Sequence, residues 1–238
     1  MPDKPLAYDA YEELADAYAE KAEHQPFNAY LERPATRALI PDVADKLVLE
    51  AGCGPGHNTE WLLDRGAHVS AFDISPKMLA HARDRVGNRA DLRIHDVEKP
   101  LYWLVDNSVD LVLASLVLDY VEEWRPTLKE FRRVLKREGC LVLSCMHPAY
   151  EFVIEPGDGD YFKVQRIDTL WKSWGEPLLM PSFRRPLSDI ADALGDAGFL
   201  IDRLVEARPT DDFKRVDPEG YAKVSKRPNF LNIRALPK

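Results

Sequence analysis

The hydrophobic pattern changes period along the chain. From Tyr8 to about Lys21, apolar or aromatic residues recur every three or four positions and predict an amphipathic helix, and a second helix is expected from Pro34 to Ile40. From residue 46 onward, short apolar runs alternate with helical segments. The predicted strands are 46–50, 68–72, 91–95, 109–114 and 140–145, and the predicted helices between them are 59–65, 76–86 and 125–136. This alternation predicts a parallel sheet with both faces covered.

The alternation stops after Cys145. Residues 147–186 contain many aromatic side chains and prolines but no long periodic helix, so we expect a functional loop that forms a lid on the sheet. A helix is predicted again over 188–197, and strands over 199–206 and 230–235. The length of 238 residues is compatible with one large α/β domain. We therefore predict a single domain over 1–238, with an N-terminal helical cap over 1–41 and a lid insertion over 147–186.

Composition and charge exclude several classes of protein. Hydrophobic residues make up 45% of the chain, which is enough for a core and excludes dominant disorder. The formal net charge of −8 has the wrong sign for a surface that binds nucleic-acid phosphates. No apolar run is long enough to predict a membrane span or a signal peptide, and Cys53, Cys140 and Cys145 form no CxxC pair. We expect a cytoplasmic protein with no metal and with neither nucleic acid nor a membrane as partner.

A glycine-rich loop, Glu50-Ala-Gly-Cys-Gly-Pro-Gly56, follows the first predicted strand. Open parallel sheets bind ligands at this place, and glycine lets a backbone adopt positive φ or approach a ligand closely. The alternative is a tight strand-to-helix turn. A dinucleotide fingerprint would need a third glycine where His57 stands, and a P-loop would need a following Gly-Lys-Ser or Gly-Lys-Thr. The loop is therefore not expected to hold a pyrophosphate.

Two carboxylates follow the next two predicted strands. Asp73 ends the second strand, and Asp96 follows the third. An ionised carboxylate can accept both hydroxyl hydrogens of a ribose, and a second one can accept from an exocyclic amine. Each alone is compatible with a helix cap or a turn. Together, beside the glycine loop, they predict an adenosine pocket.

These motifs resemble those of the Rossmann-like (class I) S-adenosylmethionine-dependent methyltransferases, small-molecule type. Residues 48–56, 72–75 and 95–97 look like the first three motifs of that family, 108–114 looks like its fourth strand, and the similarity covers about residues 8–146. It implies a three-layer sandwich with a mainly parallel seven-stranded sheet, an antiparallel last strand, and S-adenosylmethionine as cofactor with S-adenosylhomocysteine as product. The cofactor-binding residues implied are Tyr18, Arg33, Glu50, Gly52, Cys53, Gly54, Gly56, Asn58, Thr59, Asp73, Ile74, Met78, Asp96, Val97 and Ser115.

The acceptor side is less closely specified. Methyl transfer from a sulfonium is an in-line displacement, so a base is needed only when the acceptor atom carries a proton. His147 and Asp119 are the candidate bases, although both residue types also cap helices. We hypothesise that Tyr161, Trp171 and Trp174 close over a planar or apolar acceptor; the alternative is that they pack the lid onto the sheet.

The family members that methylate nucleic-acid or protein amide groups carry Asp/Asn-Pro-Pro-Tyr/Phe after the fourth strand, but this chain reads Ala114-Ser-Leu-Val-Leu-Asp-Tyr120. This departure and the acidic charge indicate a small, uncharged or cationic acceptor, with a nitrogen, oxygen or carbon nucleophile left open. The rivals are a non-catalytic S-adenosylmethionine-binding module or partner subunit, and an NAD-linked oxidoreductase that His57 disfavours. A monomer or homodimer is expected.

Overall fold

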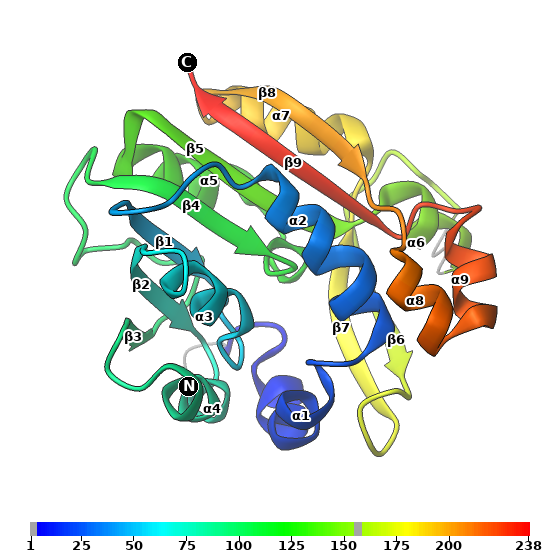
Figure 1. Cartoon of the computed structure of the whole chain (residues 1–238). Coiled ribbons are helices and arrows are strands. Elements are labelled where there is room, and N and C mark those ends of the chain that lie inside the picture. The colour runs from blue at the N-terminus through cyan, green and yellow to red at the C-terminus, as the bar shows by residue number, and fades with distance from the viewer. Residues whose placement is uncertain (1–3, 155–158) are drawn as a thin grey trace.

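A seven-stranded sheet forms the centre of the computed structural model, which describes residues 4–154 and 159–238 (Figure 1). Its strand order is β3-β2-β1-β4-β5-β9-β8. Six strands run in the same direction, and β9 runs in the opposite direction between β5 and β8. The strands are β1 (Leu47–Ala51), β2 (His68–Asp73), β3 (Asp91–Ile94), β4 (Val109–Ser115), β5 (Leu135–Met146), β8 (Phe199–Glu206) and β9 (Phe230–Pro237). The predicted mainly parallel, seven-stranded α/β fold is confirmed.

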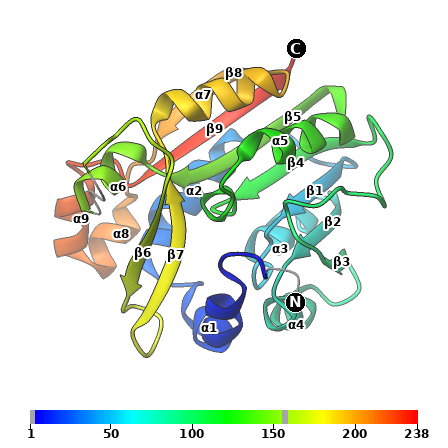
Figure 2. The ribbon, with the colours of Figure 1, turned by 180° about the vertical axis from the view of Figure 1, so that it is seen from behind.

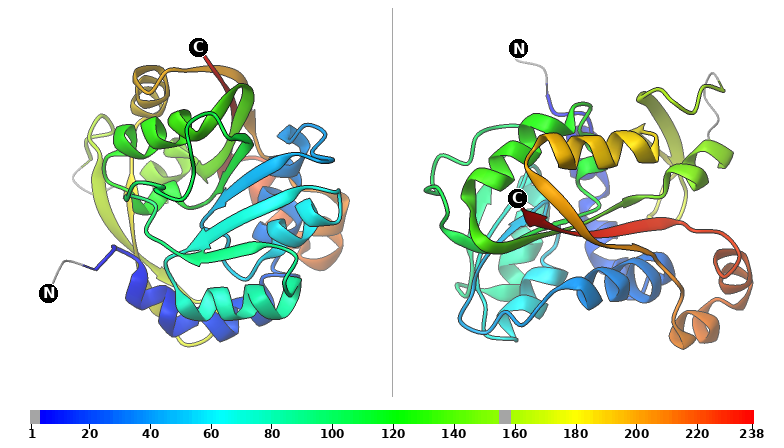
Figure 3. Two further views of the ribbon diagram at one scale, coloured as in Figure 1. Left: turned by 90° about the vertical axis from the view of Figure 1, so that its left-hand side faces the viewer. Right: turned by 90° about the horizontal axis from the view of Figure 1, so that it is seen from above.

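Helices cover both faces of this sheet, as the left view of Figure 3 shows. One face carries α2 (Arg33–Leu39), α3 (His57–Leu63) and α4 (Pro76–Val86), and the other carries α5 (Trp124–Val134) and α7 (Leu187–Asp196). Neighbouring residues of a strand point to opposite faces, so Val48 packs in one core cluster and Leu49 in the other. This is why the central strands β1 and β4 are mostly apolar.

Local sequence signals explain where several of these helices begin. Ser75 caps α4 because its side chain accepts a hydrogen bond from the Met78 amide, and Pro76 occupies the first helical position. The helix before β1 begins earlier than predicted, because a π-helical segment, η1 (Asn28–Glu32), runs directly into α2. This extension brings Glu32 over the ends of β4 and β5.

The junction of α5 and β5 also differs from the prediction. The helix ends at Val134 and the strand begins at Leu135, where Leu135 pairs with Val109 before a bulge in the β4–β5 ladder. Gly139 passes so close to β4 that a Cβ atom there would lie 2.8 Å from the carbonyl oxygen of Asp110. The close backbone approach therefore explains both the glycine and the longer strand.

The segment that follows β5 contains regular structure rather than loop alone. It includes α6 (Pro148–Ile154) and an antiparallel hairpin of β6 (Gln165–Trp171) and β7 (Leu178–Arg184), which is separate from the main sheet. The hairpin lies beside α1 (Tyr8–Lys21), as Figures 1 and 2 show. Residues 155–158, within the predicted lid, lie outside the described residues.

Two short helices near the C-terminus were not predicted individually. They are α8 (Asp211–Val216) and α9 (Pro218–Val224), and the side chains of Thr210 and Asp217 cap their first turns. None of the helices in the described ranges is both long and apolar enough to cross a lipid bilayer.

Candidate active site

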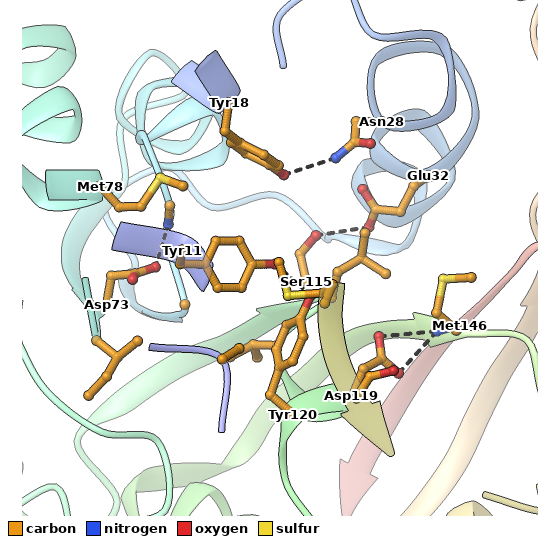
Figure 4. Close-up of a pocket in the computed structure, with 18 of the residues that line it drawn as sticks. Tyr11, Tyr18, Asn28, Glu32, Asp73, Met78, Ser115, Asp119, Tyr120 and Met146 are labelled. Carbon is orange, nitrogen blue, oxygen red and sulfur yellow. Dashed lines mark hydrogen bonds between the residues drawn. The ribbon is translucent and has the colours of Figure 1, made fainter. Parts of the chain in front are cut away.

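A cavity of about 500 Å³ opens where the parallel strands end. Gly52, Asp73, Asp96, Ser115 and Met146 follow or end the five parallel strands β1 to β5, and all of them line it. Residues of α1, η1 and the β6–β7 hairpin complete its wall. Figure 4 shows this arrangement, in which segments far apart in the sequence surround one space.

The glycine loop forms one side of the cavity. Gly52 and Gly54 have φ of 65° and 52°, and a Cβ atom on Gly52 would lie 2.6 Å from Cγ2 of Val117. A Cβ atom on Gly54 would meet nothing within 4 Å, so the backbone there is open to a ligand. The Gly54 amide donates to Oδ2 of Asp73 at 2.8 Å, and the Cys53 amide donates to the Phe72 carbonyl oxygen at 3.0 Å. These bonds fix the loop against the end of β2.

Asp73 is positioned to receive two hydroxyl groups. Its Oδ2 accepts from Gly54, as described, and its Oδ1 accepts from the Ser75 amide at 2.9 Å. A carboxylate oxygen has two acceptor sites, so each oxygen keeps capacity for one further donor on the cavity side. Burial raises the pKa of the Asp73 carboxyl. The residues present therefore fit the ribose of an adenosine cofactor.

Several polar side chains line the cavity together with the glycine loop. Glu50 accepts from the Thr59 hydroxyl at 2.6 Å, and Asn58 accepts from Nε of Arg37 at 2.9 Å. Arg33 donates to the Ala22 carbonyl oxygen at 2.8 Å, and burial lowers its pKa. Burial also raises the pKa of Tyr18, here to about 12. These groups could hold the charged amino-acid part of the cofactor.

Thirteen of the fifteen residues expected to bind the cofactor line the cavity, and Gly56 and Thr59 do not. A Cβ atom on Gly56 would lie 3.2 Å from Cα of Ala82, so this glycine allows α3 and α4 to pack closely. Thr59 lies behind Glu50 and holds its carboxyl group. These two residues support the loop from outside the cavity.

Glu50 is expected to make stability depend on pH. Burial raises the pKa of its carboxyl from 4.5 to about 7, so the folded state binds this proton more tightly than the unfolded state does. The free energy of unfolding should therefore fall as pH rises from 4.5 through 7. Glu50→Gln should reduce that fall by about 2–3 kcal/mol, measured by urea denaturation at pH 5 and pH 8. If the free energy of unfolding fell equally in the wild type and in Glu50→Gln, the raised pKa assigned to Glu50 would be contradicted.

One further carboxylate of the cavity, that of Glu32, was not anticipated from the sequence. Oε1 of Glu32 accepts hydrogen bonds from the hydroxyls of Thr36, Ser115 and Ser144 at 2.6, 2.8 and 2.6 Å. Glu32 is only 3% exposed and lines the cavity. It joins η1 to the ends of β4 and β5, and no spacing in the sequence signals this convergence.

Tyr11 and Tyr120 face one another within the cavity wall. Their hydroxyl oxygens are 2.5 Å apart, and their rings meet edge to face. In Figure 4, Asp73 and Met78 lie on one side of this pair, and Glu32 and Asp119 lie on the other. The cavity therefore has a half next to the glycine loop and a half next to Asp119, which we call the cofactor half and the acceptor half.

The two candidate bases are placed differently. Asp119 lines the cavity, its two carboxylate oxygens accept from the Met146 amide at 3.2 Å each, and burial raises its pKa. His147 is not among the lining residues. Its Nδ1 accepts from the Ala149 amide, and its Nε2 lies 3.2 Å from the Glu206 carboxylate. The structure thus places His147 as a capping residue at the start of α6, as the alternative interpretation had it, rather than in the cavity.

Of the three aromatic residues predicted to contact an acceptor from the lid, two line the cavity and one does not. Trp171 and Trp174 line the cavity, and Trp174 stacks on Tyr18 with ring centroids 4.3 Å apart. Tyr161 does not line it, because its hydroxyl accepts from the Leu187 amide and its ring packs against Phe152. Tyr161 therefore joins the inserted segment to α7 and lies outside the lining of the cavity.

The comparisons with known proteins agree with this geometry. Residues 49–143 match the family model described as a methyltransferase domain. The structure of an S-adenosylmethionine-dependent methyltransferase from Mesorhizobium loti is 25% identical, with a TM-score of 0.70 over 90% of this chain and 99% of that one. This chain contains a methyltransferase domain over residues 49–143, and its fold is that of the class I S-adenosylmethionine-dependent methyltransferases.

The likeness in fold covers nearly the whole chain, whereas the likeness in sequence to curated relatives covers about half of it. A solved structure from Listeria monocytogenes shares the fold, with 22% identity and a TM-score of 0.75 over 94% of this chain and 99% of that one. The malonyl-[acyl-carrier protein] O-methyltransferase of Enterobacter lignolyticus is 30% identical over 56% of this chain and 53% of its own length. The chain spans about half the length of the curated relatives it matches.

The family implies S-adenosylmethionine as cofactor, and the glycine loop and Asp73 fit it. Within residues 4–154 and 159–238, no three His, Cys, Asp or Glu side chains are grouped so that they could hold a metal ion.

Proposed function

We propose that this protein binds S-adenosylmethionine in the cofactor half of the cavity and transfers its methyl group to a small molecule held in the acceptor half. The observation that carries this proposal is the single cavity: the glycine loop and Asp73 line the same space as Asp119, Tyr120 and Trp171 (Figure 4). A cofactor and an acceptor bound there would be adjacent, as an in-line displacement requires.

The chain's own residues position the reactants. The bound cofactor supplies a methyl group that its sulfonium already activates. Asp73 and the amides of the glycine loop orient the adenosine part, while Asp96 and Val97 border the place expected for the adenine. Ser115, held by Glu32, stands where the two halves meet. Asp119 is available to take a proton from an acceptor that must lose one.

The residues predicted as a lid contribute to the acceptor half. We propose that the segment 147–186 covers a bound acceptor and excludes water from it, because Trp171, Trp174 and Met180 line the cavity from the hairpin. The ring of Trp174 also rests on Tyr18 of α1. The hairpin and the N-terminal helical cap therefore close the same space from adjoining sides.

Trp171→Ala is expected to raise KM for the acceptor several-fold, since it removes a wall of the acceptor half. Affinity for S-adenosylhomocysteine should change less. Tyr161→Ala is the matched control, because this ring belongs to the same inserted segment but lies outside the cavity. Steady-state kinetics of both variants checks this, and equal effects on KM would contradict the role of the lid.

The curated relatives suggest a second acceptor, a malonyl group on an acyl carrier protein. The free carboxylate of such a group would enter a half-cavity lined by Glu32, Asp119 and Glu151. Burial already disfavours negative charge at Asp119 and Glu151, since it raises the pKa of both carboxyls, so a further carboxylate would bind poorly beside them. We therefore favour a small acceptor without negative charge.

Turnover with labelled cofactor tests the proposed function. The protein is incubated with methyl-labelled S-adenosylmethionine and fractionated small molecules from cell extract. We expect label to enter a small molecule and S-adenosylhomocysteine to form. Binding of S-adenosylhomocysteine without turnover in any fraction would instead support the non-catalytic binding module.

A further inference from the structure

The acceptor half contains a carboxyl group that has no hydrogen-bond or ion-pair partner among the residues that the structure describes. Glu151 lies in α6, is 4% exposed and lines the cavity. Its carboxyl group makes no hydrogen bond and no ion pair with any residue in the described part of the chain. A buried carboxyl without a partner is costly, so one that faces a cavity points to a ligand that supplies the partner.

Asp119 is close enough to Glu151 for the two groups to affect each other's protonation. Burial raises the pKa of both carboxyls, and for Glu151 the charge of Asp119 is the next largest cause. The carboxylate of Glu32 raises the pKa of Asp119 further. Three carboxyl groups from η1, from the segment after β4 and from α6 thus face one enclosed space.

The two cations that act on the Glu151 carboxyl come from outside the lining of the cavity. Arg184 and Arg185 lower the pKa of Glu151, but neither lines the cavity. The Arg185 guanidinium donates to the Asp189 carboxylate and to the Val121 carbonyl oxygen. That of Arg184 donates to the Gln165 side chain. The carboxyl groups of Asp119 and Glu151 therefore line the cavity, while these two arginines do not.

Aromatic rings form part of the wall of the cavity that these carboxyl groups line. Tyr120, Tyr150, Trp171 and Phe230 all line the cavity. The negative faces of aromatic rings attract cations, and carboxyl groups do so more strongly. A wall of this composition favours an organic cation over a neutral molecule or an anion of the same size.

We propose that the methyl acceptor carries a positively charged amino group, which binds between the carboxyls of Asp119 and Glu151. This inference rests on the proposed function and adds the chemical class of its acceptor. The ammonium group supplies the hydrogen-bond donors that Glu151 lacks in the protein. Because the bound cation stabilises the charged carboxylates, binding also releases the proton that burial otherwise retains on this pair.

Titration calorimetry on protein saturated with S-adenosylhomocysteine tests this proposal. The ligands are primary amines on several small alkyl and aryl skeletons, each compared with the alcohol and the carboxylate of the same skeleton. We expect the tightest ligand to be an amine that binds roughly tenfold or more tightly than its alcohol, as expected for hydrogen bonds to charged groups. Measurements in buffers of different ionisation enthalpy should show proton release.

Glu151→Gln and Glu206→Gln separate the site from a general charge effect. The first should remove most of the preference for the amine and leave alcohol binding unchanged. The second removes a carboxylate that pairs with His147 outside the cavity, and should change nothing. The proposal is overturned if alcohols or carboxylates bind as tightly as amines, if no amine binds, or if Glu151→Gln weakens all three ligand types equally. Failure of S-adenosylhomocysteine to bind would instead overturn the proposed function.

Discussion

Replacing Asp73 with alanine is expected to weaken S-adenosylhomocysteine binding by about 1.5–3 kcal/mol, the range for hydrogen bonds to a charged group. The substitution removes the acceptor for ribose hydroxyls and leaves the amides of Gly54 and Ser75 without their side-chain partner. The loop and the ligand are therefore affected together. Titration calorimetry measures the affinity, and Asp73→Asn should have a smaller effect because it retains one oxygen.

Asp91→Ala provides the control for this substitution. Asp91 begins the neighbouring strand β3, pairs with Arg93 at the surface and does not line the cavity. Its removal should leave the affinity unchanged. Thermal unfolding without ligand shows whether Asp73→Ala is folded. A folded Asp73→Ala protein with wild-type affinity would contradict the assignment of the ribose site.

Replacing Glu32 with alanine is expected to lower the free energy of unfolding by about 2–4 kcal/mol. Three hydroxyl groups, from Thr36, Ser115 and Ser144, would lose their common acceptor. Thr36 and Ser144 are fully buried, and an unsatisfied buried donor costs about 1–3 kcal/mol before relaxation. Glu32→Gln should cost less, because its amide oxygen accepts the same hydrogen bonds. Urea denaturation measures both differences.

Glu20→Ala is the matched control, since Glu20 is exposed on α1 and should change stability by less than about 0.5 kcal/mol. If Glu32→Ala were as mild as Glu20→Ala, the carboxylate would not hold η1 against β4 and β5. The acceptor half would then lack the rigid wall described for it.

The cofactor half could be predicted from the sequence because its signals are local. Gly52 and Gly54 stand within one loop, and Asp73 and Asp96 each follow a predicted strand. Parallel strands bring their carboxyl ends to one edge, so local position alone places these residues together. The same reasoning predicted α4, whose start is fixed by Ser75 and the proline after it.

The acceptor half could not be predicted in this way. Tyr11, Glu32 and Glu151 come from α1, η1 and α6, and tertiary packing alone brings them to one space. His147 and Tyr161 show the converse case: both were selected for their proximity in sequence to a strand end or a lid, and neither lines the cavity. The first turns toward Glu206 and the second toward α7.

The hairpin of β6 and β7 was missed for a different reason. Ile167 and Met180 are buried while their neighbours along each strand are more exposed, which is the alternation of a half-covered hairpin. The many aromatic residues and prolines of the segment obscured this period of two. The cover of the cavity is therefore a small sheet.

Titration of the wild-type protein with S-adenosylmethionine, S-adenosylhomocysteine and NAD tests the central claim most directly. The geometry of the glycine loop and Asp73, with His57 where a dinucleotide site needs glycine, predicts saturable binding of both sulfur ligands at one site and no binding of NAD. Tight binding of NAD without binding of either sulfur ligand would contradict the account.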